Sequence, residues 1–191
     1  MGRRRRLTNV QQGFDEMNEL EAYLLKHSLE IVDIEGDGNC LMRALSIHLN
    51  VDFQRLRELL VDYIIENKKE LEPFTEDNQN IDKYCINMRK DGVYGGNLEI
   101  YACAKLYNLI IIVHQLKKPV IVIQDDSPVN IIHLAYVSWE HYSGINVKKN
   151  LKCNAEYCNL VGFCASKKAH RIKGVKAIQK ATEYFINMSQ E

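Results

Sequence analysis

Cys40 has the type and surroundings of a nucleophile, because it follows the turn-forming run Gly36-Asp37-Gly38-Asn39. Glycine accepts positive φ, and Asp or Asn can bond its own backbone, so this run predicts a tight turn. The residues from Leu41 to Leu49 then predict a helix. The turn would place Cys40 in the first turn of that helix, where unpaired N–H groups and the positive dipole end favour a thiolate.

The same turn offers backbone N–H groups to a developing negative charge. Those of Asp37, Gly38, Asn39 and Cys40 are candidates for an oxyanion hole, since a helix start is an anion site. A free cysteine packed at a helix start is the alternative. The glycine-rich lead-in favours the nucleophile, provided that a histidine serves it.

A nucleophilic cysteine needs a base within hydrogen-bond reach, and the base needs an orienting group. Five of the six histidines fall on predicted helix surfaces or ends, inside strands or in a basic tail: His27, His48, His114, His133 and His170. His141 instead lies between two strand-like runs with aromatic residues around it, in Trp139-Glu140-His141-Tyr142-Ser143-Gly144. It could face a cleft while the sheet fixes its backbone, so we predict His141 as the base.

Three residues are candidates to orient His141, in the order Ser143, Asn146 and Asp37. Ser143 is two positions further along the strand and would point to the same face as the imidazole. Asp37 lies three residues before the cysteine and could equally be a pure turn former.

The elements that must position these residues follow from hydrophobic periodicity. Helical spacing predicts helices over 15–27, 41–49, 53–67, 79–89 and 97–107. Extended runs predict strands over 31–34, 109–114, 120–124, 131–137 and 142–147. Helices first and strands last indicate an α/β (α+β) layered domain over residues 13–150. Residues 1–12 are expected to form a disordered basic arm, and 151–191 an extension with a basic amphipathic helix.

The net charge of zero conceals an uneven distribution. Residues 11–166 carry 15 basic and 23 acidic side chains, a net charge of −8. This acidic body suits a partner with a basic face and argues against nucleic acid in the central site. Arg3 to Arg6 and the basic segment 167–180 could contact nucleic acid, anionic lipid or an import receptor, or could simply be solvated tails.

Composition narrows the compartment and the cofactors. No apolar run reaches the ~18 residues of a membrane span, and the N-terminus lacks a signal-peptide core, so we expect the cytoplasm or the nucleus. Six cysteines are then expected to be free thiols. Cys153, Cys158, Cys164 and His170 fit zinc spacings poorly, and the loop with Gly92, Gly95 and Gly96 lacks the Lys-Ser/Thr of a phosphate loop, so no metal or cofactor is expected.

Three boxes resemble those of the ovarian-tumour (OTU) family of cysteine deubiquitinases. They are Gly36-Asp37-Gly38-Asn39-Cys40-Leu41-Met42-Arg43-Ala44, Gly92-Val93-Tyr94-Gly95-Gly96-Asn97, and His133-Leu134-Ala135-Tyr136 through Glu140-His141-Tyr142. The resemblance implies a papain-like fold with a small central, mostly antiparallel sheet flanked by helices. It also implies that Cys40 is the nucleophile, His141 the base and Asp37 an acidic member of the catalytic set. Met42 stands where the family usually has phenylalanine, and Ser143 where relatives often have Asp or Asn.

The resemblance implies hydrolysis of the isopeptide bond after the final glycine of ubiquitin, with ubiquitin or polyubiquitin as the partner. The protein is expected to be a monomer. A channel for a Gly-Gly tail must be narrow, and its candidate walls are Tyr94, Gly95, Gly96, Trp139 and Tyr142, with core packing as the alternative for each aromatic residue. Three other functions stay open: a weak or inactive ubiquitin-binding module, a hydrolase for a ubiquitin-like modifier, and a nucleic-acid binder acting through the basic ends.

Overall fold

The computed structural model describes residues 9–75, 80–137 and 140–148. In chain order the elements are α1 (Asn9–Lys26), β1 (Leu29–Val32), α2 (Cys40–Leu49), α3 (Phe53–Glu66), α4 (Lys68–Leu71), a 3-10 turn (Glu72–Phe74), α5 (Ile81–Met88), α6 (Asn97–Leu106), β2 (Leu109–Gln115), β3 (Ile121–Gln124), β4 (Asn130–Val137) and β5 (His141–Val147). The five strands form one sheet in the order β1-β5-β4-β2-β3. Among the described strands only β2 and β4 pair in parallel, so the expected α+β fold with a mostly antiparallel sheet is confirmed.

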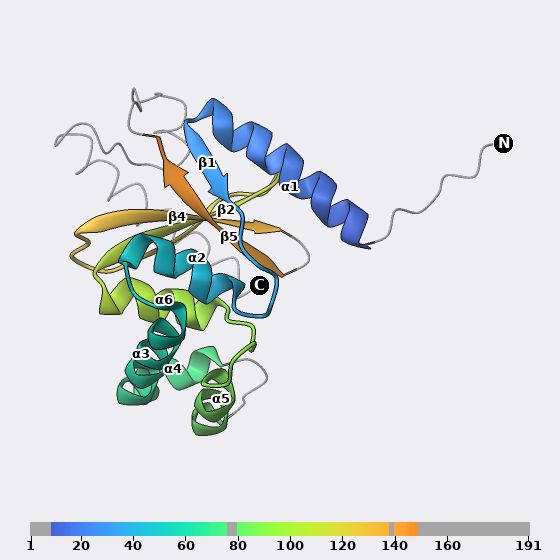
Figure 1. Ribbon diagram of the computed structural model, residues 1–191. Helices are drawn as coiled ribbons and strands as arrows, with labels where there is room; N and C mark the ends of the chain where they lie inside the picture. Colours follow the sequence, from blue (N-terminus) through green and yellow to red (C-terminus); the bar gives the residue numbers. More distant parts are fainter. Residues whose placement is uncertain (1–8, 76–79, 138–139, 149–191) are drawn as a thin grey trace, which may run out of the picture.

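The sheet separates two hydrophobic cores, with α1 above it and α2 to α6 below it in the view of Figure 1. Strand β2 shows the division, because Ile111 and Val113 belong to the lower core while Ile110 and Ile112 belong to the upper one. Burial on both faces explains why β2 is continuously apolar in sequence. Each such isoleucine contributes roughly 1.5–3 kcal/mol of burial free energy.

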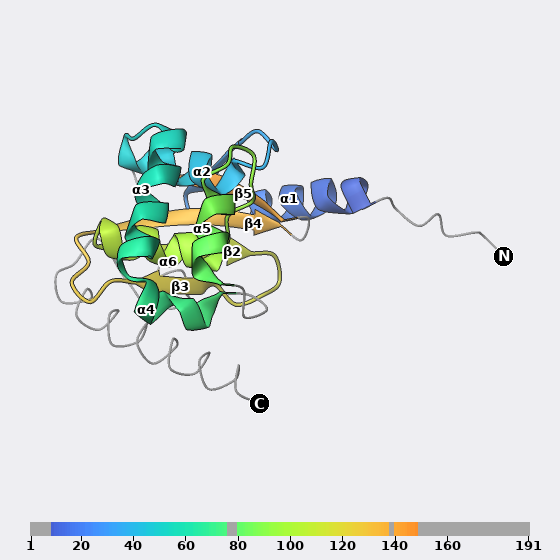
Figure 2. The same cartoon turned by 90° about the horizontal axis from the view of Figure 1, so that it is seen from below.

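The helices of the lower core begin at local capping interactions. The Asp52 carboxylate accepts from two N–H groups at the start of α3, and the Asn80 side chain accepts from Lys83 at the start of α5. Glu99, in the first turn of α6, accepts the Gly96 N–H at 2.7 Å. Figure 2 shows these helices from below, in front of the sheet. Each cap satisfies N–H groups that a helix start leaves without partners.

The sequence prediction is furthest from the structure at α1 and β1. Helix α1 begins at Asn9, so residues 9–12 of the expected disordered arm are helical, while residues 1–8 lie outside the described part. Strand β1 covers Leu29–Val32 rather than 31–34, because its register is fixed by distant β5, with Leu29 opposite Val147. The predicted helix in 151–191 also lies outside the described residues.

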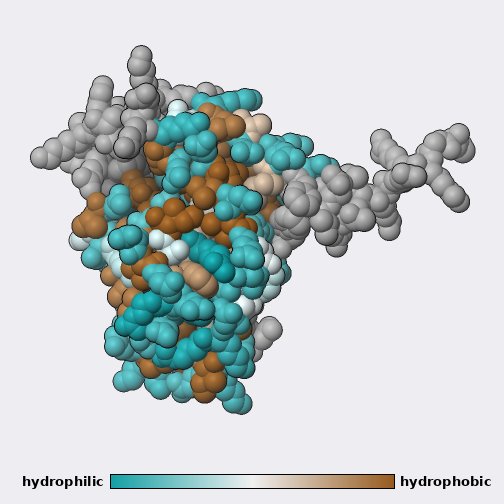
Figure 3. Space-filling model, in the orientation of Figure 1, coloured by the Kyte–Doolittle hydropathy of each residue, from teal (hydrophilic) through white to brown (hydrophobic). Residues whose placement is uncertain are grey.

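The molecular surface on the side of α2 is mixed in character. Hydrophobic residues gather around α2 and the strands above it, whereas the lower part, over α3 to α5, is largely hydrophilic (Figure 3). No helix within 9–75, 80–137 and 140–148 is long and apolar enough to cross a membrane.

Candidate active site

Cys40 is the first residue of α2, and its side chain is almost completely buried. Its sulfur lies 3.9 Å from the carbonyl oxygen of Glu140, the residue immediately before His141. The structure therefore brings the predicted nucleophile beside the residue that precedes the predicted base, across 100 positions of sequence. Helix α2 packs on β5 at Gly144, where an added Cβ would lie 3.0 Å from Ile47 Cδ1.

His141 begins β5 and pairs with Val137 of β4. Glu140, with φ of 64°, makes the turn that ends just before it. The His141 Nδ1 atom lies 3.9 Å from where a Cβ on Gly36 would be, so the imidazole rests against the cysteine turn. The end of a sheet strand thus holds the backbone of His141 while its half-buried ring faces the turn.

Burial lowers the pKa of His141, while the negative charge of Asp33 and a hydrogen bond to the Ile34 backbone raise it. Burial is the larger influence, so the ring is neutral near pH 7 and able to accept a proton from a thiol. Asp33 and Ile34 lie between β1 and the cysteine turn. Neither was predicted to orient the base, because a backbone carbonyl has no sequence signature and Asp33 lies outside the three boxes.

The three predicted orienting residues differ in their surroundings. The Ser143 hydroxyl is fully buried, and no partner for it is found among the described residues. Asn146 is exposed and lies opposite Glu30 of β1. Asp37 is bound to Arg43, with Nη2 and Oδ2 2.6 Å apart, and to the side chain and backbone of Asn39. The expected order Ser143, Asn146, Asp37 stays a prediction; the groups that raise the pKa of His141 are Asp33 and the Ile34 backbone.

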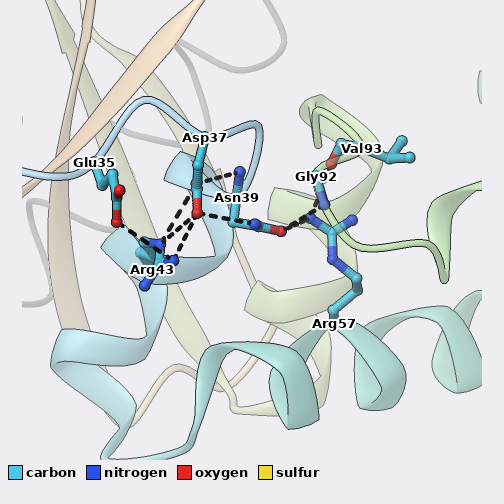
Figure 4. Close-up of polar contacts among 7 residues, drawn as sticks. All are labelled: Glu35, Asp37, Asn39, Arg43, Arg57, Gly92 and Val93. Carbon is cyan, nitrogen blue, oxygen red and sulfur yellow. Dashed lines mark hydrogen bonds and ion pairs between the residues drawn. The ribbon is translucent and has the colours of Figure 1, made fainter.

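Asp37 shapes the turn. The hydrogen bond from Arg43, followed by those from Asn39, holds the pKa of Asp37 well below its usual range, so it is ionised at neutral pH. Arg43 also stacks on the Phe53 ring, 4.0 Å from its centroid. Its Nη2 atom lies 3.7 Å from Glu35 Oε2 (Figure 4). The carboxylate thus connects the turn to α2, which agrees with the alternative role of Asp37 as a turn former.

The predicted oxyanion hole is reduced by one donor. The Asn39 N–H already donates to Asp37 Oδ1 at 2.9 Å, so it is not available to a substrate oxygen. For the N–H groups of Asp37, Gly38 and Cys40, no acceptor is found within the described residues. These three stay as the predicted donors, and they surround the start of α2.

The predicted channel residues divide into exposed and buried ones. Tyr94 is 55% exposed, and a Cβ on Gly96 would meet nothing within 4 Å, so both have open space beside them. Gly95 instead packs on Leu41, whose Cδ2 would lie 2.9 Å from an added Cβ. Tyr142 belongs to the lower core, as its alternative role required. Trp139 lies outside the described residues.

Two buried polar residues of the site were not predicted from the sequence. Arg57 of α3 bonds to Asn39 of the cysteine turn and to Val93 of the glycine loop (Figure 4). Glu99, fully buried, accepts from Tyr84 at 2.6 Å and from the Gly96 N–H. Burial raises the pKa of Glu99, although both hydrogen bonds oppose this. Both could have been found in the sequence, because each is a charged residue at a helical position that the apolar pattern turns toward the core.

The described ranges contain no group of three or more His, Cys, Asp or Glu side chains that could hold a metal ion. Cys153, Cys158, Cys164 and His170 lie outside them.

Comparisons with known proteins agree with this geometry. Residues 35–158 match a family model described as OTU-like cysteine protease. The chain is 33% identical over 145 residues to Arabidopsis thaliana OVARIAN TUMOR DOMAIN-containing deubiquitinating enzyme 7, covering 73% of this chain and 39% of that relative. It is 35% identical over 133 residues to mouse OTU domain-containing protein 3, covering 67% of this chain and 33% of that relative. The chain thus spans well under half the length of either.

Solved structures show the same fold. The OTUD1 OTU domain superposes with a TM-score of 0.63 at 26% identity, covering 73% of this chain and 99% of that domain. An OTU domain in complex with ubiquitin superposes with a TM-score of 0.53 at 19% identity, covering 62% of this chain and 69% of that one. The family match covers most of the chain and includes the cysteine turn, the glycine loop and His141. The chain therefore belongs to the OTU-like cysteine protease family.

Proposed function

We propose that this chain is a deubiquitinase that hydrolyses the isopeptide bond after the C-terminal glycine of ubiquitin. The observation that carries the proposal is the Cys40 sulfur at the start of α2, 3.9 Å from the carbonyl next to His141. A thiol at a helix start with a neutral histidine beside it is suited to acyl transfer. Relatives that carry the name deubiquitinating enzyme or ubiquitin thioesterase support ubiquitin as the acyl group.

The reaction proceeds in two displacements. His141 takes the thiol proton as the Cys40 sulfur attacks the glycine carbonyl carbon, and the N–H groups of Asp37, Gly38 and Cys40 receive the oxyanion. The C–N bond breaks, and His141 returns the proton to the departing lysine amine. Water then attacks the thioester, His141 accepts its proton, and the thiol is released with a free ubiquitin carboxylate.

The surroundings of the turn suit the tail of ubiquitin. Tyr94 and Gly96 leave open space beside the turn, which an extended Gly-Gly segment would occupy. The net charge of −8 over residues 11–166 suits a basic partner.

A ubiquitin probe with a C-terminal electrophile tests the proposal. We expect one covalent adduct, located at Cys40 by mass spectrometry, which Cys40→Ala abolishes. Cys85→Ala is the matched control, since Cys85 is a buried free thiol in α5, and it should keep the adduct. Binding of ubiquitin without an adduct would indicate a ubiquitin-binding module instead. A stronger reaction with a probe built on a ubiquitin-like modifier would indicate a hydrolase that acts on that modifier.

We further propose that the protein acts as a monomer in the cytoplasm or the nucleus. The free thiols Cys40, Cys85 and Cys103 support a reducing compartment. Light scattering after size exclusion and imaging of a tagged chain test the two statements; a dimer or an extracellular location would contradict them.

A further inference from the structure

Arg57 is a buried arginine that the proposed chemistry does not use. It lies on α3 with 2% of its surface exposed. Its Nη2 atom donates to Asn39 Oδ1 and to the Val93 carbonyl, both at 2.8 Å, and its Nη1 atom donates to the Met88 carbonyl at 2.9 Å. One side chain therefore connects the cysteine turn with the glycine loop (Figure 4) and with the end of α5.

Asn39 is the shared joint of this arrangement. Its Oδ1 atom also accepts the Gly92 N–H at 3.1 Å, and its Nδ2 group donates to Asp37 at 3.1 Å. Both the oxygen and the nitrogen of the Asn39 side-chain amide thus form hydrogen bonds, which hold in place the residue directly before Cys40. The two loops also touch through their backbones, since a Cβ on Gly38 would lie 2.0 Å from the Gly92 carbonyl oxygen.

Keeping a guanidinium in this place costs free energy. The oxygens that accept its hydrogen bonds among the described residues are neutral amide and carbonyl oxygens. Burial lowers the pKa of Arg57, which shows that its charge is unfavourable there. The charges of Asp91, Glu99, Asp37 and a Cys40 thiolate oppose that lowering. An apolar side chain of similar size would serve a merely structural role at lower cost. A planar fork of donors, in contrast, can hold several oxygens of two loops in fixed geometry.

We propose that Arg57 is a positioning residue, which acts through the Asn39 side chain to hold the cysteine turn and the glycine loop as one rigid unit around Cys40. This rests on the proposed function only where turnover is measured. Arg57 touches no reacting atom, so its loss should lower kcat more than it changes KM. It should also loosen both loops together.

Three variants test the proposal. In Arg57→Lys a single ammonium cannot replace the fork, and in Asn39→Ala the joint itself is removed. Arg55→Met is the matched control, because Arg55 lies on the same helix, is exposed, and pairs with Glu58 at 2.8 Å. With a ubiquitin–fluorophore substrate, we expect each of the first two to lower kcat at least ~10-fold, since small misplacement of a nucleophile is costly. KM should change by less than about 2-fold, because ubiquitin binding is kept. Arg55→Met should match the wild type.

Two substrate-free measurements keep this test separate from the proposed function. Amide hydrogen exchange over 36–40 and 91–96 should be at least ~10-fold faster in both variants while α1 is unchanged. The double variant should lose no more kcat than the worse single one, since both break the same connection. If the wild type does not hydrolyse the ubiquitin substrate, only the proposed function is contradicted. The hydrogen-exchange data still test the positioning role of Arg57.

The proposal is overturned by unchanged exchange in the two loops. It is equally overturned by faster exchange throughout the domain with a matching fall in Tm, because Arg57 would then serve general stability. Losses of kcat that add in the double variant would show that Arg57 and Asn39 act separately.

Discussion

The negative charge of Asp33 raises the pKa of His141, and burial of the ring acts against it. The carboxylate favours the imidazolium, so Asp33→Asn should lower the pKa of His141 further. The shift should stay below about one unit and shrink in high salt, because Asp33 is exposed. An NMR titration of the His141 ring protons, assigned with His141→Gln, measures it. Glu35→Gln, a second exposed carboxylate near the turn, is the control. An upward shift would contradict the assignment.

A substitution of Ser143 tests whether this serine has a catalytic or a structural role. Its hydroxyl is fully buried, with no hydrogen-bond partner among the described residues, so Ser143→Ala removes an unsatisfied polar group. We expect kcat/KM to change by less than about 2-fold, and the free energy of unfolding to stay equal or to rise by up to ~1 kcal/mol. Urea unfolding and steady-state kinetics check both. A loss of tenfold or more in kcat/KM would support Ser143 as a member of the catalytic set.

At the scale of elements, the meeting of the cysteine turn with the glycine loop depends on Gly38. Its φ is 82°, and an added Cβ would lie 2.0 Å from the Gly92 carbonyl oxygen. Gly38→Ala should therefore cost at least about 2 kcal/mol of unfolding free energy and most of the activity. Thermal unfolding and the ubiquitin probe measure the two effects. Wild-type stability in this variant would show that the two loops can separate freely.

Gly96 supplies the contrasting case. A Cβ there would meet nothing within 4 Å, so Gly96→Ala should change the unfolding free energy by less than ~1 kcal/mol. If Gly96 lines the channel, however, the methyl group would obstruct the Gly-Gly tail and raise KM. An unchanged KM would remove Gly96 from the channel wall.

The sequence predicted those elements whose pattern is local. Helix α2 begins at Cys40 as the turn residues indicated, and β2 was evident from its continuous apolar run. The start of β1 at Leu29 was not predictable, because pairing with β5 decides it. The roles of Arg57 and of the Ile34 carbonyl were hidden for the same reason, since each is defined by partners far away in sequence.

At the scale of the whole molecule, a buried histidine pair links acid stability to the sheet. His114 Nε2 and His133 Nδ1 lie 3.0 Å apart on the parallel strands β2 and β4. Burial lowers the pKa of His133 to about 4 and places that of His114 well below its usual value. The folded protein keeps both neutral, whereas the unfolded chain binds their protons below about pH 6.5. Stability is thus complete above pH 6.5 and decreases as the pH falls toward 4.

Replacing one member of this pair tests the effect. In His133→Gln the fall in unfolding free energy between pH 6.5 and 4 should be smaller than in the wild type by up to about 3 kcal/mol. Denaturant unfolding at several pH values measures it. His141→Gln, where the ring is only half-buried, is the control and should keep most of the wild-type slope. Equal slopes in the wild type and His133→Gln would refute the linkage.

The position of β5 between β1 and β4 has a consequence for the newly made chain. Cys40 and its turn emerge from the ribosome about 100 residues before His141, and the strand that carries His141 is anchored on both sides by strands made earlier. Until residues 141–147 insert between β1 and β4, the thiol has no base and the turn has no imidazole beside it. Such distant pairing forms late in folding, because the loop it closes is long. A half-synthesised or misfolded copy would therefore lack the proposed hydrolytic activity, so that measured activity would indicate complete folding.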